Sequence, residues 1–360
     1  MDVALDIVTG TTPPSYTMEI VRRLPATIRA RLLPSKGYGL GRLATAYRLV
    51  DHPLRILRQR RRGAVLHIDS QLLAYVLAFP QAPPRVLTCY DVVPFLPEYD
   101  DPSYVSRENR FDRLFFRRLA RGMHLADRII TVSDFTRREL VAMGIDERRI
   151  DVIPLGVDPA TFRPRPPQEC RAIRSRYGIP RDDPMVLYVG TEHPRKNLPR
   201  LYRAFAELVA PVVLVKVGAF REPQHRGLQQ LALSLKIANR VCSVEHVAAD
   251  DLPLLYGTAD VLVLASLTEG FGLPPLEAMA CGTPVAVSNA GSLPALVGTA
   301  GVRFDPLDER AIADTLRDIL ANPRTREELR AKGPARAVLF PWEATIAGIV
   351  RTYRAALAAE

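Results

Sequence analysis

The sequence is poor in the residues that cross-link a chain, bind structural metal ions or anchor a chain in a membrane. Only four of its 360 residues are cysteine, and they are scattered without a paired spacing: Cys89, Cys170, Cys242 and Cys281. This usage is typical of a reduced compartment and argues against a disulfide framework or a structural zinc site. No apolar run approaches the roughly 20 residues of a membrane helix, and the acidic, strand-like residues 1–8 do not resemble a secretory signal. We therefore expect a cytoplasmic protein without a metal site.

The overall composition is that of an ordinary globular protein. Hydrophobic residues make up 48% of the chain and charged residues 24%, and the length suffices for two domains. Short apolar runs alternate with helical stretches in both halves, which predicts α/β domains with largely parallel sheets. A proline-rich break at residues 164–167 marks the expected boundary. We expect domains at residues 1–163 and 164–341, followed by a final helix at residues 342–360.

Acidic residues are almost absent from residues 20–62. This basic segment holds twelve bases against one acid, whereas the rest of the chain has 37 bases and 38 acids. Such a segment attracts an anionic membrane surface, at about 1 kcal/mol per basic residue, and it lacks the interleaved aromatics that stack on nucleic-acid bases. We expect an anionic lipid surface as a partner and no nucleic acid; the alternative is a solvated, arginine-rich face. The bases are Arg22, Arg23, Arg29, Arg31, Lys36, Arg42, Arg48, Arg55, Arg58, Arg60, Arg61 and Arg62.

A second basic stretch, residues 110–121, has apolar side chains at helical spacing and arginines on the opposite face. The apolar positions are Phe111, Leu114, Phe115 and Leu119. A helix of this kind can lie on a membrane. Because a strand-like run follows at residues 126–133, we expect the helix to pack on the sheet of its own domain instead.

The most informative stretch is residues 269–284, which places two glutamates among glycines and prolines. Apolar runs at residues 261–265 and 285–288 flank it, so the pattern predicts a strand, a glycine-rich turn, a short helix and a second strand. Pro274 and Pro275 suit the first turn of that helix, where a missing N–H costs nothing. In a parallel unit of this kind, the ligand site lies beyond the carboxyl end of the first strand.

The two glutamates of this stretch, Glu269 and Glu277, indicate a hydroxylated ligand. A carboxylate accepts a fork of hydrogen bonds and can hold a diol, and each charge-assisted bond is worth roughly 1.5–3 kcal/mol. Gly270 and Gly272 let backbone N–H groups approach an anion, and the helix N-terminus adds a partial positive charge. The combination fits a sugar–diphosphate–ribose ligand. The alternative is that Glu277 only stabilises the first helical turn and that Glu269 is a solvated loop residue.

Residues 269–284 resemble the signature of the family-4 retaining glycosyltransferases. Four further blocks resemble the same family in the same order, at residues 126–136, 153–158, 188–198 and 250–260. The resemblance implies the GT-B fold, in which two Rossmann-like, doubly wound domains face a central cleft. It makes residues 1–163 the acceptor-side domain, residues 164–341 the nucleotide-sugar-binding domain, and residues 342–360 a helix that packs back on the first domain.

The resemblance also implies roles for individual residues. Lys196 would face the donor diphosphate, with Arg195 beside it, and would stabilise the leaving nucleotide. Glu269 would hold sugar hydroxyls and Glu277 the ribose. The backbone N–H groups of Gly270, Phe271, Gly272 and Leu273 would bind sugar and phosphate. The alternative for Lys196 is a surface base ahead of a helix.

The first half departs from the family pattern. Where relatives often carry a His-Asp pair, this chain has Tyr90 and Asp91; Tyr90 can donate a hydrogen bond to a sugar or phosphate but is not a cation near pH 7. Asp91 completes the expected catalytic set with Glu269 and Lys196 as an acceptor-side contact, and a structural turn aspartate is the alternative. A Gly-Gly pair common after the first strand is replaced by residues 9–14. Further departures are Thr191, Glu245 and Ala295, where relatives often carry arginine, glycine and an acid.

The expected activity is retaining, metal-independent transfer of a hexose, with mannose favoured. The donor would be a nucleotide-diphospho-sugar, GDP-mannose or a UDP-hexose, and no cofactor is expected. The acceptor would be a glycan or a lipid-linked molecule in cell-surface polysaccharide or glycolipid synthesis. Binding through residues 20–62 would make the protein peripheral at the inner membrane face. The alternatives are a GT-B sugar phosphorylase and a non-catalytic GT-B partner subunit.

Overall fold

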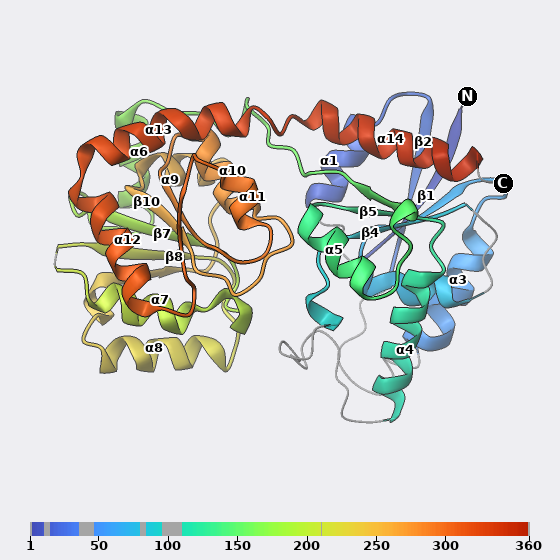
Figure 1. Ribbon diagram of the computed structural model, residues 1–360, viewed down its shortest axis with the longest axis horizontal. Helices are drawn as coiled ribbons and strands as arrows, with labels where there is room; N and C mark the ends of the chain where they lie inside the picture. Colours follow the sequence, from blue (N-terminus) through green and yellow to red (C-terminus); the bar gives the residue numbers. More distant parts are fainter. Residues whose placement is uncertain are drawn as a thin grey trace. The chain divides into compact units, whose positions relative to one another are not determined.

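The computed structural model describes residues 2–10, 15–35, 47–79, 84–95, 110–209 and 211–358. The chain divides into two compact units. Unit 1 comprises residues 1–154 and 343–360, and unit 2 comprises residues 155–342 (Figure 1). This division precedes the proline-rich break at residues 164–167. Lys36, Arg42 and residues 11–14, which the sequence singled out, lie outside the described residues.

Unit 1 is built on a six-stranded sheet in the order β2-β1-β3-β4-β5-β6, and every pair of neighbouring strands is parallel. Its strands are β1 (Val3–Thr9), β2 (Ile28–Pro34), β3 (Val65–Ile68), β4 (Arg85–Cys89), β5 (Arg128–Thr131) and β6 (Ile150–Val152). Its helices are α1 (Ser15–Arg23), α3 (His52–Gln59), α4 (Arg110–His124), α5 (Asp134–Ala142) and α14 (Trp342–Ala358). Short π or 3-10 turns cover Tyr47–Asp51, Gln71–Ala78, Val93–Phe95 and Glu147–Arg149.

Helix α4 packs on its own domain, as the sequence predicted. Phe115 and Leu119 are buried in the core of unit 1. Gly122 approaches the 3-10 segment Gln71–Ala78 so closely that a Cβ atom there would lie 1.8 Å from the carbonyl oxygen of Ala74. Leu114, which we expected on the apolar face, is instead 42% exposed. Of the four apolar positions named from the sequence, Phe115 and Leu119 are therefore buried and Leu114 is not, and the side chain of Phe111 lies outside the described ones.

The C-terminal helix α14 belongs to unit 1, although unit 2 separates it from the rest of that unit along the chain. The hydroxyl of its Tyr353, which is fully buried, lies 2.8 Å from Nδ1 of His67 on β3. Thr352 donates a hydrogen bond of 2.8 Å to Asp151, and Thr345 donates one of 2.8 Å to the carbonyl of Pro154. These bonds join the C-terminal helix to residues 1–154, the other segment of unit 1.

Unit 2 repeats the doubly wound pattern, with a six-stranded parallel sheet in the order β12-β11-β10-β7-β8-β9. Its strands are β7 (Met185–Val189), β8 (Val213–Val217), β9 (Val241–Val244), β10 (Val261–Leu264), β11 (Val285–Ser288) and β12 (Val302–Phe304). Its helices are α6 (Pro167–Arg176), α7 (Leu198–Ala206), α8 (Gln224–Ser234), α9 (Leu252–Thr258), α10 (Leu273–Ala280), α11 (Leu293–Val297), α12 (Glu309–Ala321) and α13 (Pro323–Ala337), with 3-10 turns at Pro194–Lys196 and Ala238–Arg240.

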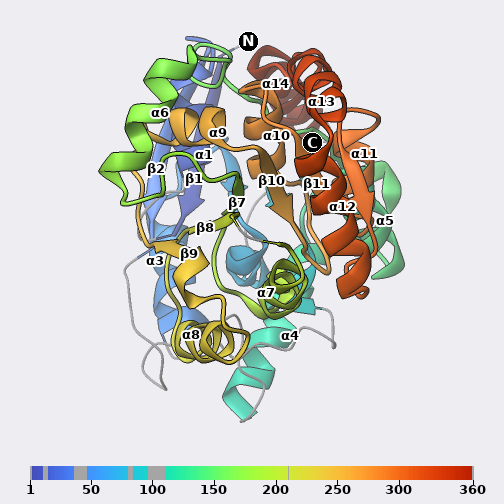
Figure 2. The same cartoon turned by 90° about the vertical axis from the view of Figure 1, so that its left-hand side faces the viewer.

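Helices cover both faces of the sheet of unit 2. In Figure 1, α6, α9, α10 and α13 lie above the strands and α7 and α8 lie below them, and Figure 2 turns this unit toward the viewer. Because both faces are covered, the strands are mostly apolar, and every residue of β8, β10 and β11 is buried, Lys216 among them. The α/β fold class expected from the sequence is confirmed in both units.

Each sheet reverses its winding direction once, and the candidate sites are expected at the strands where this reversal occurs. In unit 1 the chain passes from β1 to β2 on one side and later to β3 on the other. In unit 2 the same reversal separates β7 from β10. Ligands of such folds bind at the carboxyl ends of the strands beside the reversal. A ligand is therefore expected beside the loops that follow β1, β3, β7 and β10.

Several arginines of the basic segment are paired with acids outside it. Asp6 on β1 is completely buried and accepts two hydrogen bonds of 3.1 Å from Arg31. It also accepts bonds from the backbone N–H of Arg61 at 2.8 Å and from Nε of Arg61 at 2.9 Å. Arg29 pairs with Asp2 on the surface, at 3.2 Å. The local excess of positive charge is therefore smaller in the fold than in the sequence.

Among the described residues, no helix combines the length and the apolar character needed to cross a bilayer.

Replacement of Asp6 by asparagine should destabilise unit 1 by about 1–3 kcal/mol, because two guanidinium groups would lose their charged partner. The matched control is Asp2→Asn, which removes an exposed pair with Arg29 and should cost less than about 1 kcal/mol. Urea denaturation monitored by circular dichroism measures both changes. Equal effects of the two substitutions would contradict the structural role of Asp6.

Candidate active site

The loops after β7 and β10 meet at the reversal of the unit 2 sheet, since these two strands are hydrogen-bonded neighbours. The loop after β7 carries Arg195 and Lys196, and the loop after β10 carries Glu269. Leu267 N–H donates a hydrogen bond of 2.8 Å to the carbonyl of Arg195 and joins the two loops directly. The sequence-predicted residues of both loops therefore lie together.

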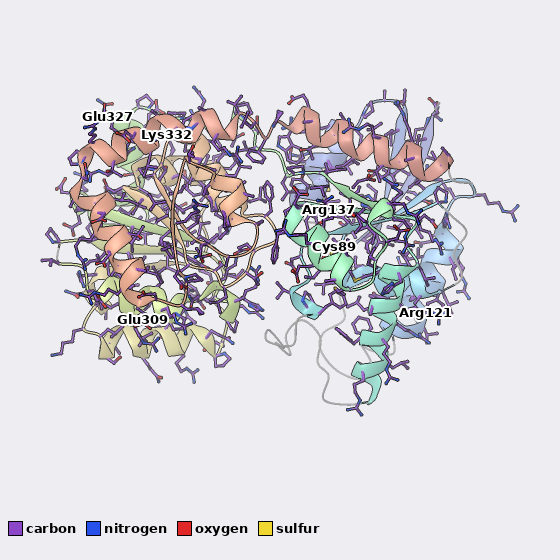
Figure 3. The ribbon with its side chains drawn as sticks, viewed as in Figure 1. Cys89, Arg121, Arg137, Glu309, Glu327 and Lys332 are labelled. Carbon is purple, nitrogen blue, oxygen red and sulfur yellow. The ribbon has the colours of Figure 1, made fainter. Side chains whose placement is uncertain are left out.

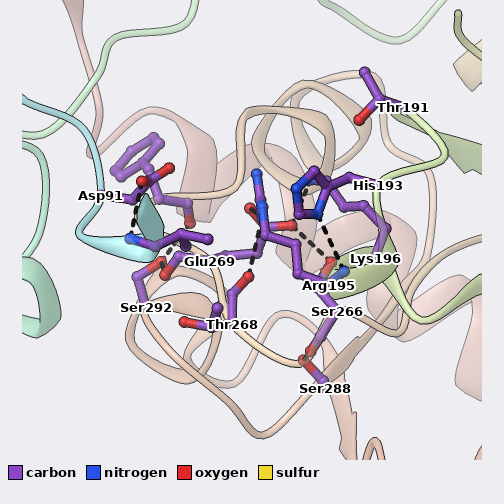
Figure 4. A network of polar contacts seen from close by, with 12 residues as sticks. Asp91, Thr191, His193, Arg195, Lys196, Ser266, Thr268, Glu269, Ser288 and Ser292 are labelled. Carbon is purple, nitrogen blue, oxygen red and sulfur yellow. Dashed lines mark hydrogen bonds and ion pairs between the residues drawn. The ribbon is translucent and has the colours of Figure 1, made fainter. Parts of the chain in front are cut away.

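The carboxylate of Glu269 binds both cations of the neighbouring loop (Figure 4). Its Oε1 accepts hydrogen bonds from Nζ of Lys196 at 2.5 Å and from the hydroxyl of Ser266 at 2.6 Å. Its Oε2 accepts a bond of 2.9 Å from Nη1 of Arg195. The same guanidinium group donates to the carbonyl of Thr268 at 3.0 Å. Glu269 is thus a buried, fully ion-paired residue, and the alternative of a solvated loop residue is wrong.

The pKa of Glu269 shows which effects dominate at this position. Burial alone would raise the pKa of the carboxyl group, because charge is costly away from water. The charges of Lys196 and Arg195, together with the hydrogen bonds from Lys196 and Ser266, outweigh burial and lower the pKa to about 2. Glu269 is therefore ionised at every physiological pH and serves as a permanent acceptor of hydrogen bonds.

Serine and glycine residues hold the backbone around Glu269 in place. The Ser292 hydroxyl donates to the carbonyls of Glu269 at 3.0 Å and of Phe271 at 2.8 Å. Gly291 packs against the same turn, and a Cβ atom there would lie 2.6 Å from the Glu269 carbonyl oxygen. Asn197, at φ 59°, donates to the carbonyl of Ala265 at 3.0 Å. The carbonyl groups of the turn are thus occupied by the protein itself.

The backbone N–H groups of the same turn have no such partners. Within the described part of the chain, the N–H groups of Gly270, Phe271 and Gly272 donate to no protein acceptor, and all three residues are buried. Gly272 caps α10 at φ 107°, a conformation that favours glycine. Buried donors at a helix N-terminus normally find an acceptor. The turn is therefore suited to bind an anion or a sugar oxygen.

Glu277 lies on α10, away from the ion pairs of Glu269. Its Oε2 accepts a hydrogen bond of 2.8 Å from the hydroxyl of Tyr256. The residue keeps some exposed surface, but its carboxyl group is surrounded by protein. Burial raises the pKa of this carboxyl to about 7, and the hydrogen bond from Tyr256 opposes the shift only in part. The pKa values of the two signature glutamates are therefore shifted in opposite directions, down for Glu269 and up for Glu277.

A second ion pair beside the loop after β7 was not anticipated from the sequence. Lys216 on β8 is fully buried and donates to Oε1 of Glu192 at 2.7 Å and to the carbonyl of Gly218 at 2.8 Å. Nδ1 of His225 lies 2.8 Å from the same carboxylate, and the N–H of Arg221 donates to it at 2.8 Å. In the sequence, a lysine inside the otherwise apolar run of residues 213–217 could have indicated a buried ion pair. The cluster fixes the loops that follow β7 and β8 relative to one another.

In unit 1, the structure separates the two expected acceptor-side residues. Oδ1 of Asp91 accepts hydrogen bonds from Nε2 of Gln71 at 3.1 Å and from the N–H of Val93 at 3.2 Å. These bonds stabilise the turn, as the structural alternative for Asp91 predicted. Tyr90 is partly exposed, and its backbone N–H donates to Oε1 of Gln71 at 3.2 Å. Asp91 is partly exposed as well.

Two family models cover nearly the whole chain. Residues 1–161 match the model described as Glycosyltransferase Family 4, and residues 170–336 match Glycosyl transferases group 1. The O-antigen chain mannosyltransferase B of Escherichia coli is 32% identical over 334 residues, which are 89% of this chain and 84% of that protein. The chain belongs to glycosyltransferase family 4. The resemblance inferred from the five sequence blocks is thereby confirmed.

Other relatives match this glycosyltransferase over less of their length. The D-inositol 3-phosphate glycosyltransferase of Frankia alni is 37% identical over 227 residues, which are 59% of this chain and 54% of that protein. Members of the family are retaining hexosyltransferases, and this glycosyltransferase transfers a sugar from a nucleotide-sugar.

Solved structures identify the fold as GT-B. Sucrose-phosphate synthase from Thermosynechococcus elongatus superimposes with a TM-score of 0.82 at 22% identity and covers 99% of this chain and 100% of that one. The Anabaena protein HepE, in complex with UDP and glucose, gives a TM-score of 0.82 at 18% identity over 98% of this chain and 100% of that one. The GT-B expectation for the glycosyltransferase is confirmed.

The glycosyltransferase should lose stability as the pH rises through the titration of Glu277. The folded pKa of about 7 exceeds the ordinary value of 4.5, so the folded state holds an extra proton between these values. The contribution is fully present below about pH 4.5 and is lost by about pH 7. Glu277→Gln should therefore raise stability at pH 8 by up to about 3 kcal/mol relative to wild type, and by much less at pH 5.

Chemical denaturation at the two pH values measures this difference. The matched control is Glu327→Gln, since Glu327 is exposed on α13 (Figure 3) and the same change of charge should have little effect there. A pH-independent difference between Glu277→Gln and wild type would contradict the raised pKa.

Proposed function

We propose that this glycosyltransferase moves a hexose, with mannose favoured, from a nucleotide-diphospho-sugar to a hydroxyl group of a glycan or a lipid-linked acceptor. The observation that carries the proposal is the Glu269–Arg195–Lys196 network beside the unpartnered N–H groups of Gly270 to Gly272. The E. coli relative, named an O-antigen chain mannosyltransferase, supports GDP-mannose as donor and cell-surface polysaccharide synthesis as the pathway. The HepE complex with UDP-glucose supports a UDP-hexose as the second candidate.

The site provides a separate group for each part of the donor. Lys196 and Arg195 would bind the diphosphate and stabilise the charge that develops on it as the sugar leaves. Glu269 would accept hydrogen bonds from the sugar hydroxyls, and Glu277 would accept them from the ribose. The N–H groups of residues 270–273, which include Leu273 at the start of α10, would bind sugar and phosphate oxygens. Tyr90 would contact the acceptor, and no cofactor or metal is part of the proposal.

The ion pairs of Glu269 create a competition that the proposed function must resolve. Without a donor, the carboxylate neutralises part of the positive charge of Lys196 and Arg195. A diphosphate would compete with the carboxylate for the same two cations. Once the cations bind phosphate, the carboxylate becomes available for sugar hydroxyls. Glu269 should therefore oppose nucleotide binding and yet favour the transfer step.

The test is calorimetric binding of GDP, UDP and ADP to the wild type and two variants. One nucleotide should bind selectively to wild type, and Lys196→Met should weaken its binding by at least about tenfold, because a charge-assisted bond to phosphate is lost. Glu269→Gln should bind the nucleotide at least as tightly as wild type, although transfer should fall by about 10²–10³-fold, in line with the loss of one transition-state contact.

Opposite changes of affinity and rate in Glu269→Gln distinguish the proposal from simple loss of folding. Weaker nucleotide binding in Glu269→Gln would refute the competition. Failure of all three nucleotides to bind wild type would refute the proposed function and favour a GT-B sugar phosphorylase or a non-catalytic GT-B partner subunit. Phosphorolysis of a glycan with inorganic phosphate then separates these two alternatives.

We also propose that the protein binds the cytoplasmic face of an anionic membrane. Helix α3 exposes Leu54 and Arg58, and helix α4 exposes Leu114 between basic residues. Both helices pack on the 3-10 segment Gln71–Ala78. Arg121 of α4, labelled in Figure 3, is exposed. Exposed leucines among arginines suit a surface that binds anionic lipid and inserts shallowly. The exposed bases of α4 are Arg113, Arg117 and Arg121.

Vesicle co-sedimentation tests this surface. Wild type should bind phosphatidylglycerol vesicles and not phosphatidylcholine vesicles, and binding should weaken as salt screens the charges. The double variant Arg117→Glu/Arg121→Glu should bind at least about tenfold more weakly, since each lost base contributes about 1 kcal/mol. The matched control Arg303→Glu/Arg310→Glu makes the same change of charge at exposed positions of unit 2 and should bind as wild type does. Equal binding to neutral vesicles would refute the electrostatic contact.

A further inference from the structure

A cavity of about 600 Å³ lies at the edge of the unit 2 sheet opposite the candidate active site. Among its lining residues, Pro184 and Asp260 directly precede β7 and β10, and Gly282 lies shortly before β11. All strands of this sheet are parallel, so these residues mark the amino ends of three neighbouring strands. The loops of the candidate active site follow the carboxyl ends instead. A cavity of this size suits a small molecule.

The side chain of Arg174 on α6 forms a fixed wall of this cavity. It is only 5% exposed, and its Nη1 donates to the carbonyls of Arg181 and Asp183 at 3.0 and 2.7 Å. Its Nε and Nη2 donate to the hydroxyl and the carbonyl of Thr258, at 2.8 Å each. Arg181, also in the lining, is exposed and donates to the hydroxyl of Ser175 at 3.1 Å. Arg174 is therefore occupied by the protein, and it holds the segment before β7 in place.

Two other arginines line the cavity on the side of β11 and have unused hydrogen-bond donors. Gly282 shows that they are close: a Cβ atom there would lie 3.5 Å from Cγ of Pro164, the neighbour of Arg165, and 3.7 Å from the carbonyl oxygen of Arg330. Nε of Arg165 is buried and has no hydrogen-bond partner among the described residues. Arg330 donates one bond of 3.3 Å to the carbonyl of Ala259. Within the described residues neither guanidinium group has an ion pair, so this end of the cavity is suited to an anion.

The side of the cavity before β7 carries acids. Asp182 and Asp183 line it, and in the described part of the chain neither carboxylate has an ion pair or a hydrogen bond. Asp260, before β10, is already paired with Arg174 at 3.9 Å. Because β10 lies between β7 and β11, the starts of the two outer strands are about 10 Å apart, two strand spacings. The cavity thus has an acidic end near β7 and a basic end near β11.

We propose that this cavity is a second ligand site, which binds a phosphorylated sugar with its phosphate on Arg165 and Arg330 and its hydroxyl groups on Asp182 and Asp183. Guanidinium groups donate charge-assisted hydrogen bonds to phosphate, and carboxylates accept the hydrogens of sugar hydroxyls. Inorganic phosphate makes only the first contact, and a neutral sugar makes only the second. The site shares no residue with the candidate active site, so it does not depend on the proposed function.

Two buried thiols report whether the cavity is occupied. Cys170 on α6 and Cys281 after α10 line it and are 2% and 4% exposed. A reagent reaches such thiols only when the structure opens locally. A ligand that binds the closed structure should therefore slow their alkylation by a factor of about 1 + [L]/Kd. Cys242 on β9 and Cys89 on β4 are not part of the lining and serve as internal controls.

The experiment is alkylation of the whole protein with iodoacetamide, with each cysteine quantified separately by peptide mass spectrometry. Mannose 6-phosphate or glucose 6-phosphate at about 10 mM should slow the labelling of Cys170 and Cys281 at least about tenfold. The labelling of Cys242 and Cys89 should not change. Inorganic phosphate should slow the labelling of the two cavity thiols less, and methyl α-D-mannopyranoside should slow it by less than about twofold.

Variants assign the protection to the basic end. Arg165→Ala/Arg330→Ala should fold, since neither side chain has an ion pair in the described part of the chain, and should lose the protection by hexose phosphates. The matched control Arg303→Ala/Arg310→Ala removes the same charge at exposed positions of unit 2 and should keep it. Lys196→Met, which alters the candidate active site, should also keep it. Circular dichroism establishes that each variant is folded.

A second pair of variants tests the acidic end. Asp182→Asn/Asp183→Asn should be protected by hexose phosphates and by inorganic phosphate to the same extent, because the contact that distinguishes them is weakened. The proposal would be overturned if no hexose phosphate protects Cys170 and Cys281 in wild type. Protection that persists in Arg165→Ala/Arg330→Ala, or that disappears in Lys196→Met, would also overturn it. Binding of nucleotides in calorimetry has no influence on these outcomes.

Discussion

The structure of the donor site depends on one carboxylate held between two cations. Glu269 comes from the loop after β10, and Lys196 and Arg195 come from the loop after β7, so the ion pairs join the two strands at which the sheet reverses. Burial makes each charge expensive by itself. The three charges are stable only together, and this mutual dependence fixes the backbone that presents the N–H groups of residues 270–272.

The two glutamates of the signature illustrate how environment separates identical side chains. Glu269 binds two cations and has a pKa of about 2. Glu277 has a phenol as its side-chain partner among the described residues and a pKa of about 7. One is therefore a permanent anion, and the other is poised between its charged and neutral forms. Asp6 and Asp69 repeat this contrast in unit 1, where one acid has two arginines and the other has a threonine.

Much of this could be predicted from the sequence, and the exceptions have physical reasons. The alternation of strands and helices and the five family blocks correctly predicted the fold and the family. The signature led to Glu269, and the block at residues 188–198 led to Lys196. Which side chains bind each other could not be predicted. Glu192 contacts Lys216, and Asp69 contacts Thr17, because of the order and register of the strands. For Asp91, a turn role and a ligand role fit the same sequence equally well. Arginine counts overstated the basic segment, since its acidic partners are distant in sequence.

The position of α14 has a consequence for biosynthesis. Unit 2 is a continuous segment, whereas unit 1 needs the last helix of the chain, whose Tyr353 is buried against β3. Because a ribosome releases the chain from its N-terminus onward, unit 2 can fold while the unit that began first still lacks its final element. The strands of unit 1 are synthesised first but are covered by α14 last. A chaperone that shields their apolar surface would therefore have to bind them until the end of the chain is synthesised.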